Sequence, residues 1–509
     1  MTDIDQTSLI GGNNLSGLLP EEIRGLADLQ VLNLASNRIA GSLPASIGTL
    51  TSVTNIGVSE NFFTDALPPS LFLLPSLVEI DITDNDFLGG IPDTFANATS
   101  LVDFYAGNNE RLGGQMPQFL SESTTMDVFS AFNCGLSGRI PDFSSTATLR
   151  ALIVGSNDIT GTIPASLTQL RTMEFLSVED NKLVGSIPPF GGQFSAVIYF
   201  SASENELTGT IGDVLATLPP HRLTFFEVRD NQFVGTIPTE IGNFGLLSHL
   251  RVSSNSLEGS IPSEFGRLTA LRSVCNLSLN QLTGTLPTEL GRLSLLQNLF
   301  VSDNAFTGPI PSEIGGMTSL RVFEAASNFL SGTIPSQLRN IETMSHFGVF
   351  ENRDIYGDIG NVLNSFTSSL SVAFLGNLNL NGTLPTNVGR FTEMVTLRLQ
   401  NSQIEGSIPD TVGLMTALTS FHIDGNRMNG TIPTDIGRLT RLVEFEMDQN
   451  RFMGPLPPQM SNLRSLASAD ISENELTGSL APLSGIGTLR ECMVVDLLLL
   501  LLLLLLLLL

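Results

Sequence analysis

Apolar residues recur along the chain with one dominant spacing. The stretch that ends at residue 268 reads LLSHLRVSSNSLEGSIPSEFGRL, and the stretch that ends at residue 317 reads LLQNLFVSDNAFTGPIPSEIGGM. Both fit L-x-x-L-x-V-x-x-N-x-L-x-G-x-I-P-x-x-I-G-x-L, with apolar residues at each Leu, Val or Ile position. An asparagine marks each copy at steps of 24 to 26 residues. This predicts a repeat protein, in which a unit buries its apolar face only by stacking on its neighbours.

The marker asparagines extend over nearly the whole chain. They are Asn13, Asn37, Asn61, Asn85, Asn109, Asn133, Asn157, Asn181, Asn205, Asn231, Asn255, Asn280, Asn304, Asn328, Asn352, Asn377, Asn401, Asn426, Asn450 and Asn474. Counted from the I-P pair, three repeats place another residue at the marker position, namely Glu110, Cys134 and Ser402, with an asparagine one residue earlier. A small polar or thiol side chain fits such a turn, so we expect Cys134 to be structural.

Each part of the repeat predicts a local structure. The alternation of Leu250 and Val252 with polar residues indicates a strand with one buried face. The marker asparagine is a compact amide that can satisfy backbone groups buried at the bend, which otherwise cost about 1–3 kcal/mol each. The proline that follows has no N–H and ends strand pairing. Segments such as 263–268 and 312–317 are too short for long helices, so the convex side should carry turns, short second strands and 3₁₀ or brief helical pieces.

Composition excludes several classes of protein. The 509 residues are 42% hydrophobic and 15% charged, which is too apolar for a disordered chain. Lys and Arg number 24 against 50 Asp and Glu, a net charge of −26, so nucleic acid and anionic membranes are poor partners. Cys134, Cys275 and Cys492 lie many repeats apart. No disulfide is expected among them, and the chain is not a disulfide-dense scaffold.

The repeat resembles the plant-type leucine-rich repeat through its N-x-L-x-G-x-I-P string, from about residue 8 to residue 489. That class is typical of ectodomains of leucine-rich-repeat receptor-like kinases and receptor-like proteins, and of secreted polygalacturonase-inhibiting proteins. The resemblance implies an α/β solenoid, a right-handed superhelix or horseshoe of about twenty 24-residue repeats, with one long parallel β-sheet on its concave face. It also implies recognition without catalysis, since the concave and lateral surfaces of the family bind peptides, steroids, co-receptors or glycan-active enzymes.

The domain prediction is a solenoid over residues 1–491, without a recognisable N-terminal cap, and a low-complexity tail over 492–509. The tail ends in thirteen leucines, 497–509. As a helix they span about 20 Å, against about 30 Å for a bilayer core. Three interpretations stay open for the run: a low-complexity artefact, a clipped transmembrane helix, or a glycolipid-anchor signal. Membrane attachment is expected only through this run.

Candidate binding residues are the polar and aromatic side chains at concave positions. They are Asp81, Asp84, Glu179, Asp180, Glu227, Arg229, Asp230, Arg251, Phe300, Asp303, Glu324, Phe350, Glu446 and Asp448. Together they form an acidic strip with occasional phenylalanine anchors, which suits a basic peptide or protein. The alternative is an ordinary solvated sheet face in an acidic protein.

No motif indicates catalysis. The four histidines, His221, His249, His346 and His422, fall in separate repeats, and the chain carries no C-x-x-C, H-E-x-x-H or G-x-x-x-x-G-K-[ST]. We therefore expect no catalytic residues, no metal site and no cofactor. Five N-glycosylation sequons begin at Asn14, Asn97, Asn276, Asn381 and Asn429, and they are compatible with secretion.

Three functions follow from this sequence. The first is a non-catalytic module that recognises a protein or peptide ligand, as the repeat region of a receptor-like surface protein. The second is a secreted inhibitor of a wall-degrading enzyme, which would use the same concave surface. The third is an intracellular scaffold, because no basic and apolar signal peptide follows Met1. A cell-surface or extracellular location is expected if the N-terminus is truncated, and a cytoplasmic one otherwise.

Overall fold

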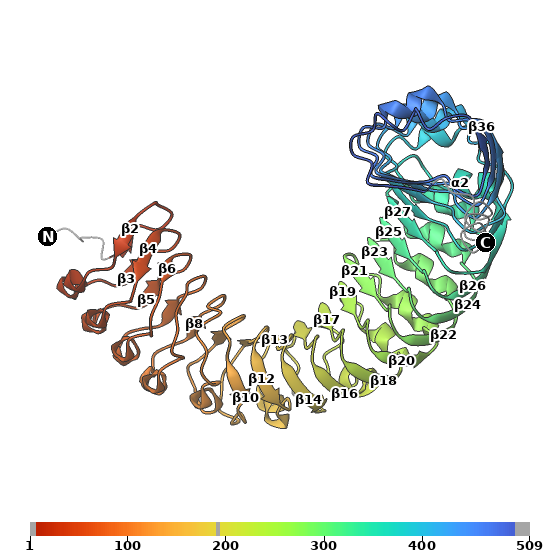
Figure 1. Cartoon of the computed structure of the whole chain (residues 1–509). Helices are drawn as coiled ribbons and strands as arrows, with labels where there is room; N and C mark the ends of the chain where they lie inside the picture. Colours follow the sequence, from red (N-terminus) through yellow and green to blue (C-terminus); the bar gives the residue numbers. More distant parts are fainter. Residues whose placement is uncertain (1–6, 190–193, 494–509) are drawn as a thin grey trace, which may run out of the picture. The chain divides into compact units, whose positions relative to one another are not determined.

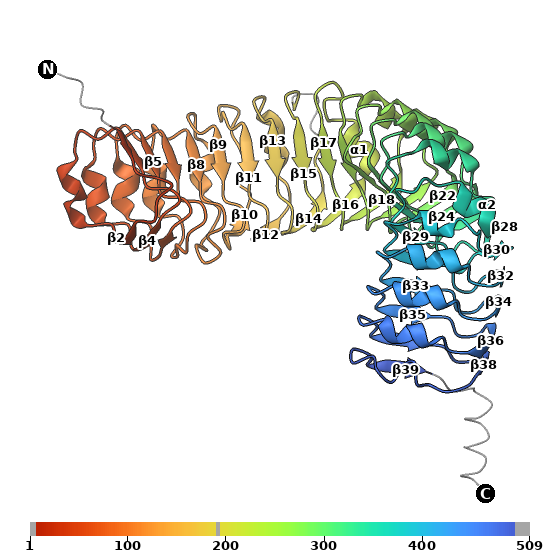
Figure 2. The same cartoon turned by 90° about the horizontal axis from the view of Figure 1, so that it is seen from above.

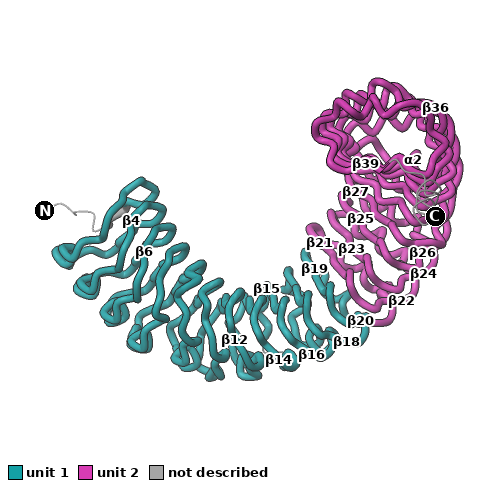
Figure 3. Tube along the Cα trace, viewed as in Figure 1, with its two compact units in different colours: residues 1–256 teal, residues 257–509 magenta. Residues whose placement is uncertain are grey.

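The computed structural model describes residues 7–189 and 194–493 (Figure 1). The run of thirteen leucines, 497–509, lies outside the described residues. Its three interpretations therefore stay predictions. Across the described part of the chain, no helix combines the length and apolar character needed to cross a membrane. The chain divides into two compact units, Met1–Ser256 and Leu257–Leu509 (Figure 3). A single solenoid over residues 1–491 also stays a prediction.

Each unit is a stack of repeats, as the sequence pattern predicts, and neighbouring strands lie side by side in Figures 1 and 2. The long parallel sheet takes one three-residue strand from each repeat. In unit 1 its strands are β1 (Thr7–Leu9), β3 (Val31–Asn33), β5 (Asn55–Gly57), β7 (Glu79–Asp81), β8 (Asp103–Tyr105), β9 (Val128–Ser130), β11 (Ala151–Ile153), β13 (Phe175–Ser177), β15 (Tyr199–Ser201), β17 (Phe225–Glu227) and β19 (His249–Arg251). In unit 2 they are β21 (Val274–Asn276), β23 (Asn298–Phe300), β25 (Val322–Glu324), β27 (His346–Gly348), β29 (Val372–Phe374), β31 (Thr396–Arg398), β33 (Ser420–His422), β35 (Glu444–Glu446), β37 (Ser468–Asp470) and β39 (Glu491–Met493).

A second set of parallel strands, also as expected, begins just after the marker position in most repeats. In unit 1 these are β2 (Ser16–Leu18), β4 (Arg38–Gly41), β6 (Phe62–Phe63), β10 (Ser137–Arg139), β12 (Asp158–Gly161), β14 (Lys182–Ser186), β16 (Glu206–Thr210) and β18 (Gln232–Thr236). Next come β20 (Ser256–Gly259), which pairs with β22, β22 (Gln281–Thr285), β24 (Ala305–Pro309), β26 (Phe329–Gly332), β28 (Asp354–Asp358), β30 (Asn379–Asn381), β32 (Glu405–Gly406), β34 (Arg427–Gly430), β36 (Arg451–Pro455) and β38 (Glu475–Thr477).

Short helices close the repeats, and most are 3₁₀ helices that begin directly after the proline. In unit 1 they are η1 (Glu21–Gly25), η2 (Ala45–Thr49), η3 (Pro69–Leu73), η4 (Asp93–Asn97), η5 (Gln118–Ser121), η6 (Ala165–Gln169) and η7 (Thr239–Asn243). In unit 2 they are η8 (Ser263–Arg267), η9 (Thr288–Arg292), η10 (Ser312–Gly316), η11 (Ser336–Asn340), η12 (Val388–Arg390), η13 (Asp410–Leu414), η14 (Thr434–Arg438) and η15 (Pro458–Asn462).

Two repeats replace I-P by I-G, and there a short α-helix takes the place of the 3₁₀ turn. These helices are α1 (Ile211–Leu215) and α2 (Ile359–Asn364). Thr210 and Asp358 cap them, each accepting a hydrogen bond from a backbone N–H three residues later. Proline has no backbone N–H and restricts the residue before it, whereas glycine does neither, so the helix can begin at the isoleucine itself.

The core of each unit is a row of side chains from the middle of every long-sheet strand. Because the strands pair in register, Leu176, Phe200, Phe226 and Leu250 follow one another across the sheet of unit 1. All four are at most 2% exposed. The rings of Phe200 and Phe226 stack at 5.7 Å. Burial of each such side chain contributes about 1.5–3 kcal/mol, and stacking makes that burial possible.

The marker asparagine satisfies the backbone at the bend. Asn328 donates from Nδ2 to the carbonyls of Val301, Ala325 and Ala326, and its Oδ1 accepts from the N–H of Phe306. These hydrogen bonds show which residue occupies the marker position in the repeats where the sequence left it uncertain. Asn109 holds the position, fully buried, and Glu110 is exposed. Cys134 and Ser402 fill it as predicted, since each donates to a carbonyl of the preceding repeat.

Three marker asparagines lie one residue before this position. Asn133, Asn377 and Asn401 have φ between 52° and 54°, the left-handed region in which asparagine is enriched. After Asn377 the buried Leu378 takes the marker position. A count of asparagines alone does not separate these two adjacent positions.

Candidate functional site

The outward side of the long parallel sheet is the surface on which the sequence places the binding residues. In each strand the central residue enters the core, and the first and third residues point to the opposite side. The second residue after the strand continues that side. We call this surface the strand face, and we describe it separately in each unit.

Four rings form a continuous row on the strand face of unit 1. Phe175, Tyr199, Phe225 and His249 are the first residues of β13, β15, β17 and β19. Successive ring centroids are 6.4, 4.1 and 4.2 Å apart, and the last two pairs are stacked within 12° of parallel. All four side chains are half-buried, so ring edges remain open to solvent. We call these four residues the aromatic row.

A charged network borders the aromatic row. Glu227 is buried and accepts from Arg229 Nε at 2.8 Å and from Arg251 Nη1 at 3.4 Å. Arg229 also reaches Glu204 at 2.5 Å and Asp230 at 2.6 Å. The carboxylates beside Arg229 are therefore compensated within the chain.

Burial and neighbouring charges set the protonation of the row. Burial raises the pKa of Tyr199 to about 12, with smaller contributions from Glu179 and Glu227. Burial also lowers the pKa of His249, reinforced by Arg251 and opposed by Glu227. Both side chains are uncharged at neutral pH. The aromatic row is consequently a neutral, partly apolar surface with charges along one border.

The other predicted residues of unit 1 lie at the end of a strand or just after it. Asp84, Asp180 and Asp230 have φ between 50° and 53°, where aspartate is enriched for backbone reasons. Asp81 accepts from the N–H of Thr83 at 3.0 Å, and Glu179 accepts from Ser177 at 2.6 Å. Their roles in ligand binding stay predictions.

The strand face of unit 2 carries a different set of contacts. Glu324 contacts His346, whose ring packs edge-on against Phe374 with centroids 5.2 Å apart. The guanidinium of Arg398 lies over Phe374 at 5.5 Å, and Arg398 Nη2 is 3.7 Å from Glu444.

Other predicted residues of unit 2 lie either on the strand face or at the backbone position with positive φ. Phe300 and Phe350 are half-buried on the strand face, and Asp303 has φ 54°. Four residues of this face are not among the predicted binding residues, although each is the first or third residue of its strand: His346, Phe374, Arg398 and Glu444. Aligning the repeats on the marker position would have placed them on this face.

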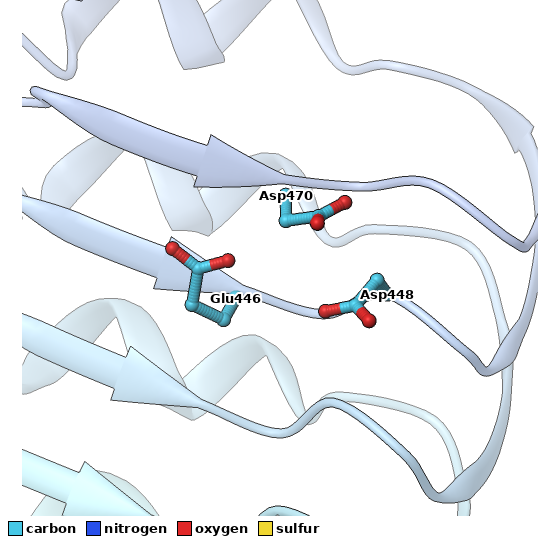
Figure 4. Close-up of side chains that lie close together, drawn as sticks. All are labelled: Glu446, Asp448 and Asp470. Atoms are coloured by element: carbon cyan, nitrogen blue, oxygen red, sulfur yellow. The ribbon is translucent and has the colours of Figure 1, made fainter. Parts of the chain in front are cut away.

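Three carboxylates gather near the C-terminal end of unit 2. Glu446 ends β35, Asp448 follows two residues later, and Asp470 ends the neighbouring β37 (Figure 4). One oxygen from each lies within 4.8 Å of the other two. We call these residues the carboxylate cluster. Oxygen-rich clusters suit hard divalent cations or cationic side chains, although this one supplies only three of the six to eight oxygens that Ca²⁺ takes.

The carboxylate cluster is electrostatically unfavourable. Burial, followed by Asp470 and Asp424, raises the pKa of Asp448 to about 6. The pKa values of Glu446 and Asp424 are also raised, mainly by burial. A bound positive charge would relieve the repulsion.

Two of the three cysteines are poorly suited to act as nucleophiles. Cys134 and Cys275 are fully buried, and burial raises their thiol pKa values to about 11 and about 12. A reactive thiolate needs a lowered pKa.

Comparisons with known proteins agree with this architecture. The sequence profile of the Leucine Rich Repeat family matches residues 28–50, 76–98, 246–268 and 295–317. A search of curated proteins finds no match.

Three solved structures are similar to the chain. The ectodomain of the Arabidopsis receptor kinase HAESA, in complex with an N-terminally extended IDA peptide hormone, is 27% identical with a TM-score of 0.87, covering 95% of this chain and 81% of that one. The PEPR1–AtPEP1 complex is 27% identical with a TM-score of 0.81, covering 96% and 75%. A TDR receptor is 26% identical with a TM-score of 0.82, covering 96% and 87%. The chain thus has a leucine-rich-repeat solenoid fold and resembles the ectodomains of plant receptor kinases.

Proposed function

We propose that this chain is the ligand-recognition region of a receptor-like surface protein, and that the strand face of unit 1 binds an extended peptide. The aromatic row carries the proposal. Partly exposed aromatic rings on a rigid sheet supply large contact area at low entropic cost, which is typical of binding hot spots. HAESA, which the chain resembles, is solved with a peptide hormone bound, and PEPR1 is solved with AtPEP1.

The surroundings of the aromatic row favour one type of peptide. Its ring edges suit an apolar or aromatic anchor, and the net charge of −26 favours basic flanking residues. Asp84 and Asp180 are better candidates for the basic contacts than Glu227, because Glu227 is buried between two arginines. The predicted acidic strip is thereby narrowed to carboxylates without an arginine partner in the described structure.

A random-peptide phage library selected on the full chain tests the proposal. We expect Tyr199→Ala and Phe225→Ala each to weaken binding of the selected phage roughly 30-fold, as for a hot-spot residue worth about 2 kcal/mol. Val234→Ala is the matched control, since Val234 is 48% exposed on β18 of the other strand set. Equal loss in all three variants, or none in the ring variants, would contradict the proposal.

The same phage selection also tests whether the strand face prefers peptides with basic residues. Asp84→Asn and Asp180→Asn remove charge but keep a side chain that tolerates positive φ. Selected peptides rich in Lys or Arg should bind these variants several-fold more weakly at low salt. Unchanged binding would leave the aromatic row as the recognition element and remove the acidic strip.

The surface location is tested at the level of the transcript. A signal peptide encoded before these repeats and a membrane segment encoded after them would support a receptor-like protein. A signal peptide alone would favour the secreted inhibitor, and neither would favour the intracellular scaffold.

A further inference from the structure

A groove of about 970 Å³ runs along the side of unit 2, between the second strand set and the short helices. Its lining combines apolar residues, among them the buried Ile310 and Ile334, with residues that carry hydroxyl and amide groups. It ends at α2, the helix of the I-G repeat. Tyr356 of β28 lines this end and is 54% exposed. An exposed aromatic ring beside hydroxyls and amides is a surface suited to a sugar.

A glycosylation sequon lies directly beside this end of the groove. Asn381-Gly382-Thr383 begins at the last residue of β30, which pairs in parallel with β28. The register places Asn381 opposite Asp358, and Asn379 opposite Tyr356. Leu380 is buried and Asn381 is exposed, so Asn381 and Tyr356 share the outward side of this strand pair. With parallel strands about 4.8 Å apart and a rise of about 3.3 Å per residue, such diagonal neighbours lie about 8 Å apart, within reach of an aromatic side chain.

We propose that Asn381 carries an N-linked glycan whose first N-acetylglucosamine residues pack on the ring of Tyr356 and enter the groove. The amide nitrogen of Asn381 displaces the diphosphate of a lipid-linked oligosaccharide. A C–N bond forms at the anomeric carbon, the C–O bond to diphosphate breaks, and the amide loses one proton. This inference rests on the proposed surface function, because such donors act in the secretory pathway.

The groove chemistry matches an uncharged, hydroxyl-rich occupant. Its lining carries two carboxylates, Glu313 and Asp358, against one guanidinium, Arg339, so the groove has little net charge. Hydroxyls and amides of Thr333, Ser336 and Asn361 can bond sugar hydroxyls and acetamido groups. The glycan would cover this side of unit 2 and leave the strand faces open to ligand.

The other sequons separate this site from a general tendency to be glycosylated. Asn276 is half-buried on the strand face, and its Oδ1 accepts from the N–H of Ser278 at 3.0 Å, so we expect it to stay unmodified. Asn429 begins the same Asn-Gly-Thr motif on β34 and is exposed, but it does not line this groove. Asn429 is therefore the matched control.

The test uses the full chain directed into the secretory pathway of insect cells. Glycopeptide mass spectrometry should find Asn381 occupied, and peptide-N-glycosidase should release its glycan from native protein more slowly than that of Asn429. Tyr356→Ala should raise the release rate at Asn381 roughly five-fold, which corresponds to losing an aromatic contact of about 1 kcal/mol. Tyr356→Phe keeps the ring and should keep the protection.

Several outcomes would overturn the inference. They are an unmodified Asn381 in protein glycosylated at Asn429, a Tyr356→Ala release rate equal to wild type, or no modified sequon in secreted protein. None of these touches the peptide selection on the strand face of unit 1, which tests the proposed function independently.

Discussion

Replacing a marker asparagine tests whether the bend is held by hydrogen bonds or by packing alone. Asn328 is the best position, because it is 6% exposed and all four of its side-chain hydrogen bonds are defined. We expect Asn328→Ala to destabilise unit 2 around β24 and β26 and Asn328→Asp to be at least as damaging.

The magnitude follows from which groups lose their last partner. In Asn328→Ala the N–H of Phe306 is left unpaired inside the protein, which costs about 1–3 kcal/mol. The three carbonyls each keep a second donor: Asn304 for Val301, Asn352 for Ala325, and the N–H of Asp303 for Ala326. Each therefore loses only about 0.5 kcal/mol. The total is about 3 kcal/mol.

Asn328→Asp separates hydrogen bonding from shape. The carboxylate has the same size and can still accept from Phe306, but its second oxygen would face three carbonyl oxygens in place of an NH₂ group. A space-filling role predicts that this isosteric variant is mild. A hydrogen-bonding role predicts a loss at least equal to that of Asn328→Ala.

Hydrogen exchange read by mass spectrometry is the appropriate assay, because repeat proteins open locally. Exchange over β24 to β26 should accelerate roughly a hundred-fold in Asn328→Ala, while β3 to β5 in unit 1 should not change. Asn340→Ala, at the exposed end of η11, is the control and should stay within about 0.5 kcal/mol. Milder effects in Asn328→Asp than in Asn328→Ala would refute the hydrogen-bond explanation.

Two further predictions concern charge and backbone packing. The pKa of Asp448 is raised from its ordinary 3.8 to about 6, so its contribution favours folding below pH 3.8 and is lost as the pH rises through 6. Asp448→Asn should then raise the free energy of unfolding at pH 7 by about 1 kcal/mol after solvent screening, with little effect at pH 4. Urea melts at both pH values measure this difference. Destabilisation at pH 7 would contradict the prediction. At Gly291 an added Cβ would lie 2.1 Å from the carbonyl oxygen of Glu313, so Gly291→Ala should cost about 2–3 kcal/mol in the same assay, while Gly245→Ala, with open space around its Cβ, should not.

The repeat architecture could be predicted almost completely from the sequence. Alternating residues such as Leu250 and Val252 define the strand, and both are 2% exposed. The short helices at 263–267 and 312–316 agree with the limit set by their length. What failed was the register at Glu110, because two adjacent asparagines both fit the spacing. Only the hydrogen bonds of Asn109 identify the residue at the bend.

The aromatic row was missed although its signal is present in the sequence. Phe175, Tyr199, Phe225 and His249 precede their marker asparagines by the same six residues. The predicted binding residues are mostly charged, whereas these rings stand out only when the same repeat position is compared across consecutive repeats. The pairing of Glu227 with Arg229 and Arg251 is different, because it depends on side-chain conformations that the repeat pattern does not specify.

Acidity on the strand face has two origins, and they carry different information about ligands. Asp84, Asp180, Asp230 and Asp303 share one backbone position with positive φ, which favours Asp or Asn whatever the ligand. The carboxylate cluster has no such reason, because Glu446 and Asp470 are ordinary strand residues whose like-charged carboxylates are held close together, and burial raises the pKa of Glu446. Overall charge therefore overstates the preference for a basic partner. Asp→Asn substitution is the informative change, because it removes the charge while keeping the side chain that the backbone favours.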